Sequence, residues 1–147
     1  MQNDRRSFAL VLLALTLGCG KPADPVRATI DAVVKAANAR DAEALLARVA
    51  SDFEAADGTG RSEVEARLKG YFAAYEVLHV QASNVQIERG DKAARVRMRV
   101  EMNGQPRTIG GIAVLLPSAA KYDFDLRLVL DGKDWKLAWA GWQPVAD

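Results

Sequence analysis

The chain has 147 residues, half of them hydrophobic, and its 20 basic and 19 acidic side chains leave a formal net charge of +1. A protein that binds nucleic acid needs a concentrated positive surface, and no basic run in this sequence provides one. One histidine and one cysteine are too few for a zinc site or an intrachain disulfide, and the sequence has no glycine pattern of a nucleotide site. We therefore expect a domain that uses no nucleic acid, metal or cofactor.

Residues 1–18 are typical of an export signal. Arg5 and Arg6 precede an apolar run of eleven residues that ends at Gly18. As a helix this run would be about 16 Å long, whereas the hydrocarbon core of a bilayer is about 30 Å thick. The run is therefore too short for a transmembrane helix, and the paired arginines leave both general secretion and twin-arginine export open.

The sequence Leu15-Thr16-Leu17-Gly18-Cys19 resembles a bacterial lipobox. The resemblance implies cleavage before Cys19, a diacylglyceryl thioether on its sulfur and acylation of the new amino group. Two or three acyl chains would anchor the protein stably to a lipid bilayer. Residues 19–24 would form a short lipidated tether, so we expect the domain on the exported side of the bacterial cell envelope. An ordinary secretory signal is the alternative, and the choice between inner and outer membrane stays open.

Three helices are predicted first. Asp24 followed by Pro25 is typical of a helix start. Asp41 can cap a second helix, and Ser62-Glu63-Val64-Glu65 has the pattern of a capping box that opens a third. Apolar residues then recur at helical spacing. They are Val26, Ile30, Val33, Val34 and Ala37 in the first helix; Leu45, Leu46 and Val49 in the second; and Val64, Leu68, Tyr71, Phe72 and Tyr75 in the third.

From Val77 onward apolar and polar residues alternate, which predicts strands, and Asp131-Gly132 predicts a hairpin before the last one. Helices followed by antiparallel strands indicate an α+β domain. On the polar face, three arginines are expected to pair across strands with aspartates, although a cationic track for an anionic ligand is the alternative. These residues are Arg95, Arg97, Arg99, Asp123 and Asp125.

The chain resembles the nuclear transport factor 2-like superfamily. The segments that carry the resemblance are Asn38-Ala39-Arg40-Asp41, Ser51-Asp52-Phe53 and Asp134-Trp135-Lys136-Leu137. The resemblance implies one domain over residues 25–147, in which a cone-shaped, curved antiparallel sheet wraps around three N-terminal helices. The superfamily includes polyketide cyclases, ketosteroid isomerases and non-catalytic domains of exported bacterial proteins. The resemblance also implies that two copies of the chain could form a homodimer through the exposed sheet face.

Asp57 is the one candidate general base. It falls where the ketosteroid isomerases that the chain resembles place their proton-shuttling aspartate. Such enzymes also need groups that stabilise the enolate oxygen, but Val33 and Leu126 stand at those places. Asp125 is offset by one residue, which points it to the opposite face of its strand. We therefore expect no catalytic site, and Asp57 is expected to bond its own loop backbone.

A mainly apolar pocket is expected inside the cone. Its candidate lining residues are Tyr71, Tyr75, Met98, Phe124 and Trp139. The only histidine, His79, is expected at the surface. The segment 105–121 contains an apolar run, from Ile112 to Leu116, which could be a buried strand, a lid or a contact patch.

These patterns favour a membrane-anchored lipoprotein whose non-catalytic domain binds an apolar small molecule or a protein. Two alternatives remain at this point. The first is an isomerase or cyclase with Asp57 as base. The second is an accessory subunit of an envelope complex that contacts another envelope protein.

Overall fold

The computed structural model describes residues 23–109, 112–113 and 116–146. The predicted export signal and Cys19 lie outside the described residues. Within these ranges the chain forms three helices: α1 (Pro25–Ala39), α2 (Ala42–Leu46) and α3 (Arg61–Ala74). The strands are β1 (Val49–Ala55), β2 (Tyr75–Arg89), β3 (Ala93–Pro106), β4 (Thr108–Ile109), β5 (Ile112–Ala113), β6 (Ala119–Asp131) and β7 (Asp134–Pro144).

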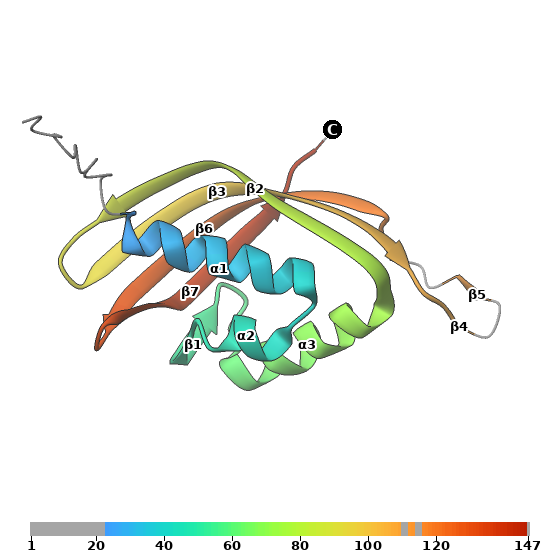
Figure 1. The fold of residues 1–147 in the computed structure, drawn as a ribbon, viewed down its shortest axis with the longest axis horizontal. Coiled ribbons are helices and arrows are strands. Elements are labelled where there is room, and N and C mark those ends of the chain that lie inside the picture. Colours follow the sequence, from blue (N-terminus) through green and yellow to red (C-terminus); the bar gives the residue numbers. More distant parts are fainter. Residues whose placement is uncertain (1–22, 110–111, 114–115, 147) are drawn as a thin grey trace, which may run out of the picture.

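Five strands form one curved sheet in the order β1-β7-β6-β3-β2. Every neighbouring pair is antiparallel except β1 and β7, which run parallel. The helices cover one face of this sheet, and the long strands β2, β3 and β6 bend around them (Figure 1). The predicted α+β class and the cone are therefore confirmed, with a sheet that does not close on itself. Among the described residues, no helix is long and apolar enough to cross a bilayer.

The helix starts follow from local chemistry. The Asp24 carboxylate accepts a hydrogen bond from the Val26 N–H at 2.8 Å, and Pro25 occupies the first helical position. The third helix starts slightly earlier than its predicted capping box. Gly60 is its N-cap, and the Glu63 carboxylate accepts from the Gly60 N–H at 3.4 Å. The predicted box of Ser62 and Glu65 is therefore replaced by one of Gly60 and Glu63, and the Glu65 carboxylate accepts from Lys69 instead.

The segment Asn38-Ala39-Arg40-Asp41 joins α1, α2 and the sheet. The Asn38 side-chain amide donates to the Val80 carbonyl and accepts from the Val80 N–H, both at 2.8 Å. Arg40 has a left-handed backbone, with φ of 53°, which ends α1, and its guanidinium donates to the Tyr75 carbonyl. Asp41 then caps α2. This short segment thus fixes where two helices meet the start of β2.

The second helix is shorter than predicted. It ends at Leu46, and Val49 begins β1 instead of extending the helix. The residues of β1 pair in parallel with β7, where Val49 lies opposite Leu137. The spacing of Leu45, Leu46 and Val49 suits a helix, but pairing with a strand nearly ninety positions later determines the structure.

A bulge in β2 keeps two apolar residues on the inner face. The pairing of β2 with β3 shifts between Ser83 and Gln86, and Asn84 has a positive φ of 51°. The extra residue changes which of the following side chains point to the inner face. Val85 and Ile87 therefore pack against the core on the same side as Ala82.

Candidate functional site

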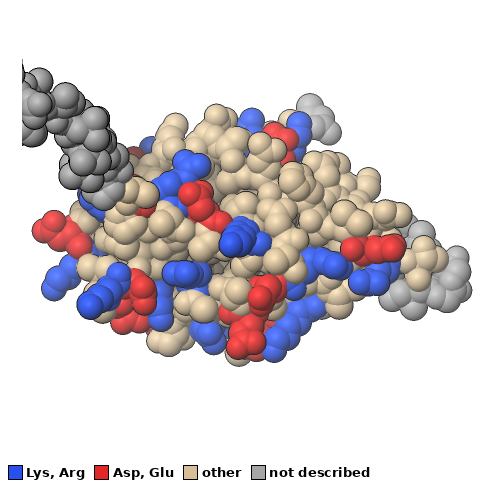
Figure 2. Space-filling model, in the orientation of Figure 1, with Lys and Arg blue, Asp and Glu red and all other residues tan. Residues whose placement is uncertain are grey.

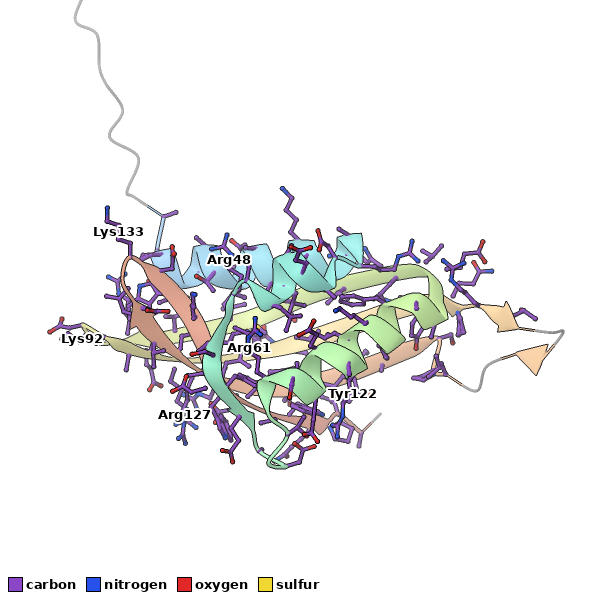
Figure 3. All side chains as sticks on the ribbon, turned by 90° about the horizontal axis from the view of Figure 1, so that it is seen from below. Arg48, Arg61, Lys92, Tyr122, Arg127 and Lys133 are labelled. Carbon is purple, nitrogen blue, oxygen red and sulfur yellow. The ribbon has the colours of Figure 1, made fainter. Side chains whose placement is uncertain are left out.

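A cavity of about 380 Å³ lies between the helices and the inner face of the sheet. Its walls come from α1, α2, α3 and from strands β1, β2, β3, β6 and β7. Figure 3 shows the helices lying over the sheet, seen from below. Apart from Thr59, Arg67 and Tyr71, every described lining residue is aliphatic, methionine, phenylalanine or tryptophan. This composition is typical of a site for an apolar ligand.

Two of the described lining residues are exposed, and they mark the mouth of the cavity. Trp142 is 43% exposed, and its ring stacks on that of Phe124 at 6.0 Å between centroids. The side chain of Arg67 is 63% exposed, and its Nη1 lies 3.5 Å from Oδ2 of Asp57. The deeper lining residues are buried or half-buried. A ligand would therefore enter past an aromatic ring and a guanidinium.

Tyr71 supplies the phenol in the cavity wall. Its hydroxyl donates to the Met102 sulfur, and its ring centroid lies 4.8 Å from that of Tyr75. Burial, helped by the hydrogen bond with Tyr75, raises the pKa of Tyr71 well above its usual range. Tyr71 is therefore a neutral donor at physiological pH and cannot serve as a base.

The five pocket candidates from the sequence have different surroundings. Tyr71, Met98 and Phe124 line the cavity. Tyr75 is fully buried in the core and donates to the Pro117 carbonyl at 2.8 Å, outside the cavity lining. Trp139 lies on the other face of the sheet, where the Arg127 guanidinium stacks over its ring at 4.8 Å.

The position of Trp139 follows from a bulge in β7. Arg127 pairs with Trp139, but the next residue of β6, Leu128, pairs with Leu137, which leaves Ala138 as the extra residue. One extra residue reverses the side on which the following side chains lie. Ala140 and Trp142 therefore line the cavity instead.

Asp57 lies in the turn after β1 and does not line the cavity. Its Oδ1 accepts from the Thr59 N–H at 3.0 Å, and its side chain is 51% exposed. Thr59, through its side chain and its backbone N–H, lowers the pKa of Asp57 below the usual range, and Arg67 adds to this effect. An exposed carboxylate with a lowered pKa is a weaker base than a free one.

The described cavity wall contains no carboxylate and no imidazole. Val33 and Leu126, which the sequence resemblance puts at the places of oxyanion-stabilising groups, both line the cavity with aliphatic side chains. Asp125 lies on the opposite face of the sheet, and His79 is exposed on β2. Within the described ranges, no cluster of histidine, cysteine, aspartate or glutamate could bind a metal.

The outer face of the sheet carries the predicted arginine–aspartate pairs. Arg95 forms two hydrogen bonds with Asp125, at 2.6 and 2.9 Å, and Arg99 forms two with Asp123, at 2.9 and 3.1 Å. These hydrogen bonds lower the pKa of both aspartates. Arg97 pairs with a glutamate of β2. The arginine charges are thus balanced by neighbours, and charges of both signs are also mixed over the face shown in Figure 2.

The segment 105–121 includes the short strands β4 and β5, which project beyond the end of the main sheet (Figure 1). Its later part rejoins the fold. Leu116 packs against the core, and the Gly104 N–H donates to the Ser118 carbonyl at 2.8 Å. The side chains of Ile109, Ile112 and Ala113 lie outside the described residues, as do residues 110–111 and 114–115.

Arg67, Thr59 and Trp142 belong to the cavity but are not among the sequence candidates. A signal for Arg67 exists, because it lies three residues after Val64 and four before Tyr71, on the same face of α3. Trp142 follows the bulge, so alternation from Trp135 assigns it to the wrong face. Thr59 offers no comparable signal.

No family model and no curated protein sequence matches the chain. Solved structures do match. The chain is similar to a "Putative Scytalone Dehydratase" from Novosphingobium aromaticivorans, with a TM-score of 0.72 and 16% identity over 83% of each chain. A "putative dehydratase from the NTF2-like family" from Streptomyces avermitilis has a TM-score of 0.69 and 16% identity, over 84% of this chain and 96% of that one. An NTF2-like protein from Cytophaga hutchinsonii has a TM-score of 0.66 and 14% identity, over 82% and 95%. The chain therefore has the NTF2-like fold.

Proposed function

We propose that this NTF2-like domain binds an apolar small molecule in its cavity and is held at the bacterial envelope by an acylated Cys19. The observation that carries the binding proposal is the apolar cavity of about 380 Å³. Its volume falls within the range of about 300–1,000 Å³ that is usual for ligand sites. Most of the cavity wall is apolar and only a few of its groups are polar, which is the arrangement that ligand sites share.

Binding accounts for the cavity better than catalysis does. Acid–base catalysis needs a titratable group within hydrogen-bond reach of the substrate, and donors placed for the charge that develops. The described wall supplies the Tyr71 phenol, whose pKa is raised, and aliphatic side chains where an oxyanion donor would stand. Two of the similar structures bear the names "Putative Scytalone Dehydratase" and "putative dehydratase", but at 16% identity they indicate the fold alone.

A cavity-filling substitution tests the binding proposal. Ala37 lines the cavity from α1, whereas Ala28 lies on the exposed face of the same helix. Ala37→Trp is expected to weaken the binding of Nile red, an uncharged apolar dye, by about tenfold or more, because the indole occupies the space. Ala28→Trp should bind the dye as the natural sequence does. Fluorescence titration measures both affinities, and equal binding by the two variants would contradict the proposal.

The same purified protein can identify the natural ligand. Mass spectrometry of organic extracts should find one compound class enriched with the natural sequence and depleted with Ala37→Trp. The Ala28→Trp variant controls for compounds that adhere to an added surface tryptophan.

The anchoring proposal is supported by the lipobox-like sequence and by the start of α1 at Pro25, six residues after Cys19. Cys19→Ser replaces the sulfur that would carry the diacylglyceryl group. Cells grown with labelled palmitate should therefore label the natural protein but not the Cys19→Ser variant. Immunoblotting controls for the amount of each protein. Equal labelling of the two proteins would show that the acyl chains are attached elsewhere and would refute this part of the proposal.

A further inference from the structure

The mouth of the cavity carries a positive charge over an apolar interior. Arg67 is the one charged side chain among the described lining residues. It projects from α3 on the same face as Val64 and Tyr71, which also line the cavity. The apolar stem of an arginine can lie along such a wall while the guanidinium stays in water at the opening. The 63% exposure of its side chain agrees with this position.

The partner of Arg67 holds it only weakly. Oδ2 of Asp57 lies 3.5 Å from Nη1, and both side chains are more than half exposed. Ion pairs between exposed groups contribute little, and a guanidinium has five N–H donors, so one long contact leaves its fork available. Asp57 is also held to its own turn by the Thr59 N–H at 3.0 Å. An incoming anion could therefore bind Arg67 without moving Asp57.

We propose that the cavity takes an amphipathic monoanion, with its apolar body inside and its carboxylate, or a similar anionic group, bound by Arg67 at the mouth. This inference rests on the proposed binding function and names its class of ligand. An apolar wall with a single cation at its exposed end selects such a molecule over a neutral one. Arginine is also suited to a carboxylate, because its fork can donate two parallel hydrogen bonds.

The test compares two ligands of equal chain length, dodecanoate and dodecanol, as competitors of Nile red at concentrations below micelle formation. The natural sequence should bind dodecanoate more tightly. Arg67→Met is expected to weaken dodecanoate binding by about tenfold and to leave dodecanol binding unchanged, since only the anion uses the guanidinium. Arg27→Met, which removes an exposed arginine paired with Asp31 on α1, should change neither affinity.

A second variant acts in the opposite direction. Asp57→Asn keeps the side-chain oxygen that accepts from Thr59 but removes the negative charge beside Arg67. It is expected to strengthen dodecanoate binding by about threefold, with no effect on dodecanol. Weaker dodecanoate binding by Asp57→Asn would overturn the inference.

The outcomes separate this inference from the proposed function. If Arg67→Met weakens both competitors equally, or neither, the anion site is refuted while the apolar cavity remains. If Nile red and both competitors bind the Ala37→Trp variant as well as the natural sequence, the cavity is not the site and both proposals fail.

Discussion

Replacing Tyr75 by alanine is expected to lower the free energy of unfolding by about 4 kcal/mol. Tyr75 is the largest fully buried side chain among the described residues, with 0% exposure, and it lies where α3 ends and β2 begins. The substitution would leave a cavity the size of a phenol ring and would remove the hydrogen bond to Pro117. A loss of this size is a large share of the roughly 5–15 kcal/mol by which such domains are stable.

Chemical denaturation monitored by circular dichroism measures this loss. Tyr75→Phe serves as the control, because it keeps the ring and removes the hydroxyl, with its 2.8 Å hydrogen bond to the Pro117 carbonyl. It should cost about 1 kcal/mol. If alanine costs no more than phenylalanine, the ring does not stabilise the core and the account of Tyr75 is wrong.

The surroundings of Tyr75 explain why the ring cannot be exchanged freely. A Cβ atom at Gly104 would lie 2.6 Å from the ring, so β3 passes directly over it with no side chain between. The Arg40 guanidinium donates to the Tyr75 carbonyl. The residue therefore joins the end of α1, the start of β2 and a close crossing of β3.

Most of the fold could be predicted from the sequence because its signals are local. The caps at Asp24 and Asp41 specify helix starts, and the two-residue alternation in β3 and β6 specifies which face is buried. The Asp131-Gly132 turn likewise joins β6 to β7, with a positive φ of 63° at the glycine. Each of these features depends on neighbours within a few residues.

What could not be predicted depends on distant partners or on single extra residues. The strand β1 exists because β7 offers it a parallel partner, and nothing local to Val49 distinguishes a strand from one more helical turn. The bulge at Ala138 moves Trp139 out of the interior and brings Trp142 to the mouth of the cavity. No residue near Ala138 predicts that the alternation between inward and outward side chains changes there.

The residues of the candidate site also divide into those that local patterns predict and those that they do not. Tyr71, Met98 and Phe124 lie on regular elements with an undisturbed period, and they line the cavity. Tyr75 shares the helical spacing of Tyr71, but the chain turns into β2 at Tyr75 and carries its ring into the core. Arg67 lies on the apolar face of α3. A charged residue within an otherwise apolar helix face can indicate the rim of a cavity.

Asn38→Ala is expected to lower the free energy of unfolding by about 3 kcal/mol. The Asn38 amide makes two hydrogen bonds of 2.8 Å with the backbone of Val80 and a third, of 3.0 Å, with the Val34 carbonyl. Strand β2 is an edge strand of the sheet, so Asn38 satisfies backbone groups on an edge that no other described strand covers. Alanine would leave both Val80 groups without their partner in a half-buried position.

Thermal and chemical unfolding of matched variants test this role. Asn103→Ala removes an exposed asparagine from β3 and should change stability by no more than about 0.5 kcal/mol. Hydrogen exchange adds a readout that a general loss of packing would not reproduce, because the Val80 amide should lose protection selectively in Asn38→Ala. If that amide stays protected while stability falls, Asn38 acts through packing and not by bonding the sheet edge. A selective loss of protection at the Val80 amide would instead show that the Asn38 side chain holds the edge strand β2 against α1.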